Sequence, residues 1–303
     1  MMSGIHAVLH KKEMKKRTAL SALHYAVLII LSLLWLVPIL FVLLTAFKTD
    51  AELTLRQFRW LPAQWHFENF RNAFHVSGYE WITYFQNSLF VTGMTVLGSL
   101  FFNSLAGYAF ARLHFRGRDA IFVVFLAGMM IPPQSIILPQ YLVMKNIPLA
   151  GGNNLLAQGG TGLLNTLWAV IIPQLCGAFG IFLCKQFYLS FPKAMDDAAR
   201  IDGCKEFRIY WNIYLPQSLT ILATLVIIKT ISVWNDFFFP LIMTTSSKMR
   251  TVQLALQVFK DNASGHWNWL MAITLITILP VIIVFLCSQK YFVQSIMASG
   301  MKN

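Results

Sequence analysis

Two charged residues, Lys229 and Asp236, interrupt the apolar run LVIIKTISVWNDFFFPLIM, and they indicate either structural pairing or solute binding. They are seven residues apart, so on a helix they fall on nearly the same face, two turns apart. A charge at the centre of a lipid-facing helix costs about 2.5–3.5 kcal/mol, so both should face protein or water. In one hypothesis, each charge pairs with a polar group on a neighbouring helix. In the other, Asp236 and Asn235 bind solute hydroxyls while Trp234 or Phe237 packs against the flat face of a sugar ring.

The longest polar segment after the amino-terminal third, residues 191–218, carries a second group of acidic residues. Asp196 and Asp197 stand where negative charge suits a helix N-terminus. Ala198 and Ala199 follow, and alanine is a good helix former with almost no side-chain bulk. The pattern predicts a short helix whose two alanines offer a flat docking face. On spacing alone, an ordinary surface helix fits equally well.

A bend is expected after this helix. Asp202 and Gly203 supply it, because glycine readily adopts the left-handed conformation that ends a helix. A second helical piece should run towards Leu215, and Pro216 marks the entry to the next apolar run. We call this predicted helix–bend–helix, residues 191–216, the elbow.

Other arrangements of reactive residues are missing from the sequence. The seven histidines are scattered without metal-ligand spacing, and the four cysteines form no C-x-x-C pair. The glycine-rich segment 151–162 lacks the Gly-Lys-Ser/Thr ending of a phosphate-binding loop. No nucleophile elbow or paired catalytic carboxylates are present, and docking explains the clustered acids of the elbow better than catalysis does. We therefore expect neither an enzyme nor a cofactor or metal in this chain.

Composition predicts a polytopic membrane protein with an all-α fold. Of the 303 residues, 57% are hydrophobic and only 12% are charged. The formal net charge of +12 could suggest nucleic-acid binding. However, the basic residues cluster at the ends of apolar runs, where they act as orientation signals. We therefore expect a lipid membrane, and no nucleic acid, as the partner of this surface.

Six apolar runs are long enough to predict six transmembrane helices. The third starts at Ala120 and contains Pro132, Pro133 and Pro139, which must break or kink it. Broken helices are tolerated where they line a cavity, so this stretch, with Gln134, is a candidate for a solute path. Alternatively, the kink serves only packing. The other five predicted spans are residues 23–47, 86–111, 164–184, 215–243 and 267–292.

Lysine and arginine are concentrated in the N-terminal tail, in the turn after the second span and in the elbow. This bias predicts that both termini and the elbow lie in the cytoplasm. The expected organisation is a tail at 1–20, a transmembrane domain at 21–292 that includes the elbow, and a tail at 293–303.

The elbow carries a motif that resembles the EAA loop of the membrane subunits of binding-protein-dependent ABC importers. The matching residues are the DAA run at 197–199, Gly203, and IYLP at 213–216. The central AARIDG is similar to the carbohydrate class of the maltose-permease type. Asp197 stands where the motif has glutamate, which keeps the charge but shortens the reach. The run LAGYAFAR, the WND segment with Pro240, and the closing stretch also resemble this class.

This resemblance implies a six-helix ABC importer permease fold in the cell inner membrane. It implies as partners two ATP-binding subunits that bind ATP and Mg, a second related permease, and an extracytoplasmic solute-binding protein. The fifth-span WND segment favours a sugar as the solute. The residues it implies for coupling to the ATP-binding subunit are Asp197, Ala198, Ala199, Asp202, Gly203, Leu215 and Pro216. The alternatives are an ABC permease for a non-sugar solute, such as a polyol phosphate or amino acid, and a secondary transporter.

Overall fold

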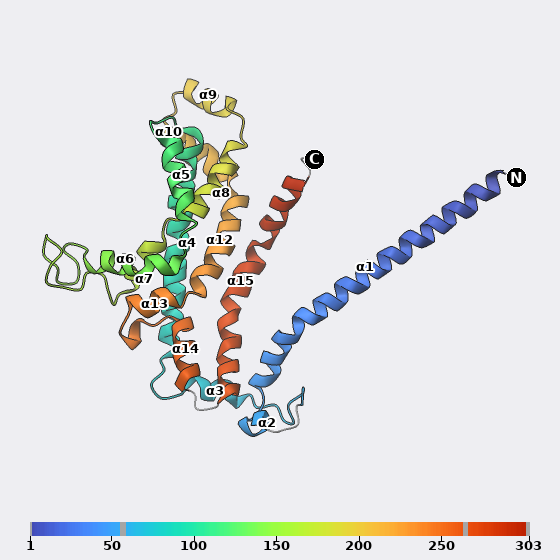
Figure 1. Cartoon of the computed structure of the whole chain (residues 1–303), viewed down its shortest axis with the longest axis horizontal. Helices are drawn as coiled ribbons and strands as arrows, with labels where there is room; N and C mark the ends of the chain where they lie inside the picture. Colours follow the sequence, from blue (N-terminus) through green and yellow to red (C-terminus); the bar gives the residue numbers. More distant parts are fainter. Residues whose placement is uncertain (1, 55–58, 263–265, 301–303) are drawn as a thin grey trace. The chain divides into compact units, whose positions relative to one another are not determined.

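The computed structural model describes residues 2–54, 59–262 and 266–300, and every regular element in these ranges is a helix (Figure 1). This confirms the all-α fold. In the first half of the chain the helices are α1 (Met2–Ala46), α2 (Asp50–Thr54), α3 (Glu68–Phe74), α4 (Trp81–Arg112), α5 (Arg118–Gly128) and α6 (Pro133–Lys145). In the second half they are α7 (Leu167–Ile171), η1 (Ile172–Gln174), α8 (Ala178–Leu189), α9 (Ala194–Ile201), α10 (Glu206–Ile209), η2 (Tyr210–Tyr214), α11 (Leu215–Gln217), α12 (Leu219–Trp234), α13 (Phe238–Met243), η3 (Ser247–Met249), α14 (Val252–Asn262) and α15 (Trp267–Gly300).

Three of the described helices are long and apolar enough to cross a membrane, and three bent pairs could each form one more span. The single helices contribute Leu23–Ala46, Trp81–Arg112 and Trp267–Lys290, close to the predicted first, second and sixth spans. The bent pairs are Arg118–Gly128 with Pro133–Lys145 (109°), Leu167–Gln174 with Ala178–Leu189 (41°), and Glu206–Gln217 with Leu219–Trp234 (76°). By length and composition the described chain therefore has three spans, or up to six.

The predicted break in the third apolar run is confirmed, but only two of its three prolines lie at it. Pro132 precedes α6 and Pro133 occupies its first turn, where the missing N–H is not needed. Pro139 lies inside α6 without ending it. A single internal proline removes one backbone hydrogen bond, which the rest of a helix can tolerate.

The fifth apolar run is not the continuous helix that we expected over residues 215–243. Helix α12 ends at Trp234, and the short helix α13 begins at Phe238. Asp236 lies in the gap, and its Oδ1 accepts a hydrogen bond of 3.2 Å from the backbone N–H of Phe239. The prediction that Lys229 and Asp236 share one helical face is therefore wrong, because Asp236 follows the end of the helix.

The chain divides into two compact units, residues 1–75 with 263–275, and residues 76–262 with 276–303. In the first unit, the Asn69 side chain donates 2.9 Å hydrogen bonds to the carbonyl oxygens of Ala46 and Lys48. Asn268 donates to the same Lys48 oxygen at 3.0 Å. These amides satisfy backbone acceptors left free where α1 ends.

The second unit is built around α4, which packs along α8 and α12 (Figure 1). Glycines allow α4 and α8 to approach closely. A Cβ atom added at Gly107 would lie 2.4 Å from Cys184 Cβ, and one at Gly180 would lie 2.5 Å from Asn103 Nδ2. Small residues at such contacts are typical of packed transmembrane helices. The α4–α8 pair is therefore a tightly fitted body, and the elbow follows α8 in the chain.

Candidate functional site

The elbow has the helix–bend–helix structure that the sequence predicts. Helix α9 ends at Ile201, and Gly203 has a φ of +76°. The Gly203 N–H donates to Arg200 O at 3.0 Å, and the Cys204 N–H donates to Ala199 O at 2.9 Å. This pair of bonds is the Schellman ending of a helix, for which glycine is the favoured residue.

The second arm of the elbow contains a feature that the sequence did not predict. After α10, the backbone follows a π-helix over Tyr210–Tyr214 before α11, which contains Pro216. The chain then bends by 76° into α12. The Ser218 hydroxyl donates to Tyr214 O at 2.5 Å, which satisfies one of the carbonyls freed by this irregular backbone. Within the second arm, Leu215 is half-buried and Pro216 is exposed.

The two alanines of the elbow do not share one docking face. Ala199 is 5% exposed and packs into the core cluster, whereas Ala198 is exposed. Asp197, Asp202 and Gly203 are exposed as well. Successive residues of a helix point about 100° apart, so neighbouring alanines cannot both face a partner squarely. The expectation of a flat two-alanine face is replaced by an outer face around residues 197–198 and the bend.

Asp196 is buried and paired rather than available for docking. Its Oδ2 lies 3.4 Å from Arg112 Nη1, and the two side chains are only 6% and 4% exposed. The Tyr214 hydroxyl donates to Asp196 Oδ1 at 2.6 Å. Sequence reasoning treated Arg112 as an orientation signal and Asp196 as one of the docking acids. The signal that could have corrected this is the spacing of Asp196 and Ala199, which at i and i+3 share the inner face of α9.

A second, more exposed group of charges closes the bend. Arg200 Nε donates to Glu206 Oε1 at 3.0 Å, and the Tyr108 hydroxyl donates to Glu206 Oε2 at 2.9 Å. Arg200 also lies 3.6 Å from Asp197. The hydrogen bond to Glu206 raises the pKa of Arg200. Both oxygens of Glu206 thus accept hydrogen bonds, one from the elbow and one from α4, whereas Asp197 and Asp202 are exposed on the outer face of the elbow.

Four buried tyrosines pack where the elbow meets the α4–α8 body. Tyr108 comes from α4, Tyr188 from α8, and Tyr210 and Tyr214 from the π-helix. Tyr210 and Ser104 share a hydroxyl hydrogen bond of 2.6 Å. Tyrosine side chains bury a large apolar area, and their hydroxyl groups form hydrogen bonds. The contact between the elbow and the α4–α8 body is therefore both apolar and hydrogen-bonded.

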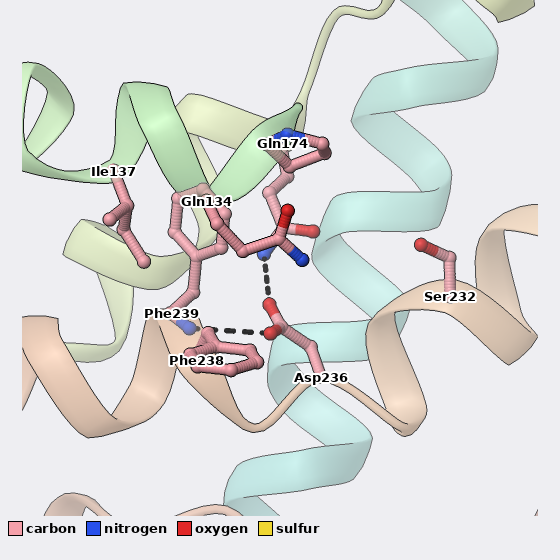
Figure 2. A pocket seen from close by; sticks show the side chains of 8 residues that line it. Gln134, Ile137, Gln174, Ser232, Asp236, Phe238 and Phe239 are labelled. Carbon is pink, nitrogen blue, oxygen red and sulfur yellow. Dashed lines mark hydrogen bonds between the residues drawn. The ribbon is translucent and has the colours of Figure 1, made fainter. Parts of the chain in front are cut away.

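A pocket of about 250 Å³ lies beside Asp236, where α12 gives way to α13 (Figure 2). Figure 2 shows the Asp236 carboxylate directed towards Gln174, whose Nε2 donates to Oδ2 at 3.1 Å. Both oxygens of this carboxylate therefore accept hydrogen bonds, since Oδ1 accepts from Phe239. The lining residues are Pro133, Gln134, Ile137, Gln174, Ser232, Asp236, Phe238 and Phe239.

The structure brings together two of the five residues expected on the solute path, Gln134 and Asp236. The other three do not line this pocket. Trp234 is 3% exposed, and its Nε1–H donates to Thr277 O at 3.1 Å. Asn235 donates to Ile231 O at 2.9 Å, and the Phe237 ring lies 5.5 Å from that of Phe238.

Four polar or aromatic lining residues were missed, namely Gln174, Ser232, Phe238 and Phe239. Gln174 stands in the apolar run VIIPQLCG, directly after a proline, and a polar side chain at such a break was a usable signal. The other three follow from the gap between α12 and α13, which the sequence pattern did not reveal. Among the described residues, no group of three or more His, Cys, Asp and Glu could hold a metal ion.

Comparison with known proteins identifies the family to which this fold belongs. Residues 103–298 match the family described as "Binding-protein-dependent transport system inner membrane component". The probable ABC transporter permease protein YurM of Bacillus subtilis is 34% identical over 268 residues, which cover 88% of this chain and 83% of YurM. The arabinooligosaccharides transport system permease protein AraQ of Halalkalibacterium halodurans is 32% identical, covering 88% of this chain and 91% of AraQ.

The fold is also similar to that of a solved transporter. A chain of a bacterial ABC transporter involved in the import of the acidic polysaccharide alginate superposes with a TM-score of 0.74 at 25% identity. The match covers 90% of this chain and 96% of that chain. Together with the EAA-like elbow, these matches show that the chain belongs to the inner-membrane permease components of binding-protein-dependent ABC transport systems.

Proposed function

We propose that this chain is a permease subunit of an ATP-driven sugar importer, forming half of the transmembrane pathway and coupling it to ATP-binding subunits. The observation that carries the proposal is the elbow: a short helix with an exposed outer face, ended by a left-handed glycine and seated on the α4–α8 body. Relatives support a sugar. Their names specify arabinooligosaccharides, starch degradation products, lactose and diacetylchitobiose.

The proposed partners supply ATP hydrolysis, the other half of the pathway and delivery of the solute. Two ATP-binding subunits would bind ATP and Mg and hydrolyse the nucleotide, and a second related permease would complete the pathway. An extracytoplasmic solute-binding protein would deliver the sugar. One similar fold belongs to an alginate transporter solved in complex with an alginate pentasaccharide-bound periplasmic protein. We place residues 21–292 in the membrane domain, with both termini and the elbow in the cytoplasm.

In the proposed mechanism, closure of the ATP-binding subunits displaces the elbow. Asp197 makes a polar contact with the ATP-binding subunit, Ala198 allows close approach, and Gly203 sets the bend. Asp202 contributes a further exposed acid, while Leu215 and Pro216 shape the second arm. Because packed helices move as bodies rather than deforming smoothly, this displacement switches access to the pathway between the two sides.

We further propose that the pocket beside Asp236 lies on the solute path. Its carboxylate and the Gln134 amide suit sugar hydroxyls, and two phenylalanine rings suit the apolar face of a sugar. No lysine or arginine is among the described residues that line the pocket, so the lining offers no cation to pair with the phosphate group of a polyol phosphate. A secondary transporter is disfavoured by the family to which the chain belongs.

The test is recovery of the complex from its own membrane in mild detergent, with mass spectrometry of the proteins that copurify. We expect an ATP-binding subunit to copurify with the parent chain but not with Gly203→Asp. A side chain at φ +76° is strained by roughly 1–2 kcal/mol, and the added charge faces the partner. Gly117→Asp is the matched control, because Gly117 lies outside the elbow with a φ of +80°, and a Cβ there would make only an ordinary contact of 3.9 Å with Ile121 Cδ1.

Gly117→Asp should keep the ATP-binding subunit and transport. The result that contradicts the proposal is a parent chain that purifies alone and still transports solute, or a Gly203→Asp chain that transports at the parent rate. A fall in both variants alike would show that strain, rather than the elbow surface, is responsible.

A further inference from the structure

Arg112, the last residue of α4, is a buried cation held at the base of the elbow. Its guanidinium reaches three groups from the chain beyond α8. Nη1 lies 3.4 Å from Asp196 Oδ2 of α9, and Nη2 donates to Phe191 O at 2.5 Å. The guanidinium carbon lies 5.2 Å from the centre of the Tyr214 ring. One side chain of α4 thus contacts the segment before α9, α9 itself and the second arm.

The network also binds Asp196 to the second arm, although the buried Arg112 Nε has no hydrogen-bond partner among the described residues. The Tyr214 hydroxyl donates to Asp196 Oδ1, so this carboxylate is bound by both Arg112 and the second arm. A planar guanidinium with several donors suits such a site better than a lysine ammonium, which is a single point charge. Breaking a buried pair leaves a charge without compensation, so the arrangement strongly favours a single position of α9.

Several connections join α9 to the rest of the second unit, among them the short backbone segment 190–193 that leads back to α8. The onward backbone towards α12 passes through the Gly203 bend, the π-helix and the 76° bend. Each of these is an irregular segment that can absorb displacement. The Arg112–Asp196 ion pair, in contrast, connects α9 directly with the end of α4.

The direct route continues to the pocket. Asn103 of α4 accepts a 3.0 Å hydrogen bond on Oδ1 from the Gly177 N–H, next to the break between η1 and α8. Gln174, the last residue of η1, donates to Asp236 in the pocket wall. Between these points α4 and α8 are fitted closely at their glycines. A chain of contacts, completed by the backbone of residues 174–177, therefore connects α9 with the pocket.

We propose that Arg112 is a positioning residue that locks α9 to α4, so that displacement of the elbow is delivered first to the α4–α8 body and through it to the pocket. The proposal rests on the proposed function, because it assumes that an ATP-binding subunit moves the elbow. It goes further in assigning the transmission to α4 and to a side chain outside the EAA-like motif.

The test follows access to the pocket in the assembled complex. Ser232→Cys, in a chain whose exposed Cys176 and Cys287 and half-buried Cys204 are replaced by serine, reports access through its reaction with a membrane-impermeant maleimide. The labelling rate is measured without nucleotide and with the Mg complex of a non-hydrolysable ATP analogue. The readout is the ratio of the two rates, taken only from complexes that retain their ATP-binding subunits. A purely structural role of Arg112 would change the yield of complex but leave this ratio unchanged.

In the parent we expect nucleotide to change the labelling rate at least tenfold. Arg112→Ala and Asp196→Ala should each bring this ratio to within about twofold of unity, and the double variant should be no worse than either, as for two residues that act as a unit. Arg200→Ala is the matched control: it removes an elbow arginine whose pairs are exposed, and it should keep the parent ratio. If Arg112→Ala does not assemble, Asp196→Asn decides the matter, since it keeps the side-chain shape and removes the charge.

An assembled Arg112→Ala or Asp196→Asn complex with the parent ratio would overturn the proposal. So would losses that add in the double variant, because they would show that the two residues act separately. These outcomes differ from failure of the proposed function, in which the parent chain itself would assemble with no ATP-binding subunit.

Discussion

The elbow and the pocket beside Asp236 each contain a half-buried or buried aspartate, but the two carboxylates have very different surroundings. Asp196 of the elbow is paired with an arginine and accepts a hydrogen bond from a tyrosine. Asp236 accepts hydrogen bonds from one amide and one backbone N–H, and it also interacts electrostatically with the half-buried Lys229 of α12. Within the described part of the chain, two polar side chains that line its pocket, Gln134 and Ser232, have no hydrogen-bond partner.

The two sets of surroundings suit different roles. A buried network in which charges are matched fixes one geometry and resists change. A pocket with unused donors and acceptors can exchange water for the hydroxyl groups of a solute. The elbow is therefore built to transmit a displacement, and the pocket is built to bind.

The two sites should differ most in their response to removal of the carboxylate. Asp196→Ala leaves Arg112 buried without compensation, and loss of one partner of a buried pair destabilises by about 3–5 kcal/mol. Asp236→Ala frees two donors and removes the charge that interacts with Lys229. Beside an open pocket water can replace the carboxylate, so we expect a smaller loss of about 1 kcal/mol. The measurement is retention of helical circular dichroism as denaturing detergent is added to the purified chain. Equal losses of stability would show that the two carboxylates contribute alike, and that Asp196 is not held in a more demanding network than Asp236.

The contact between α4 and α8, which joins the two regions, supports a smaller prediction. In Gly107→Val the new Cβ would lie 2.4 Å from Cys184 Cβ and 2.9 Å from the Lys185 backbone nitrogen. Overpacking of this kind costs about 1–3 kcal/mol. Gly93→Val is the matched control on the same helix, since a Cβ there meets nothing within 4 Å. The same detergent titration should separate the two variants, and identical curves would show that α4 and α8 do not fit as tightly as described.

The features that could be predicted from the sequence are those that depend on local pattern. Apolar length predicted the long helices, and Gly203 predicted the bend, because only glycine adopts a left-handed conformation without strain. The EAA-like residues identified the family. None of these required knowledge of which helices pack together.

The features that could not be predicted depend on contacts between distant residues. Arg112 and Asp196 are separated by 84 positions along the chain, so each was interpreted from its immediate neighbours. The end of α12 at Trp234 was missed because an apolar run continues across it. Gln174 joins Asp236 only through tertiary structure, and no spacing rule connects residues on different helices.

The smallest effect should come from the exposed charges at the bend. Arg200 and Glu206 are each 43% exposed, and such pairs contribute about 0–1 kcal/mol, which salt screens. The pKa of Arg200 is raised, so its contribution is fully present below the ordinary arginine value and is lost only as the pH rises through the higher folded-state value. Titration of Arg200 should therefore cause no change in stability between about pH 6 and 9, far below the pKa of any arginine. In detergent titrations at both pH values, Arg200→Ala should differ from the parent by the same small amount. A difference that grows across this range would mean that another group, rather than this arginine, controls the bend.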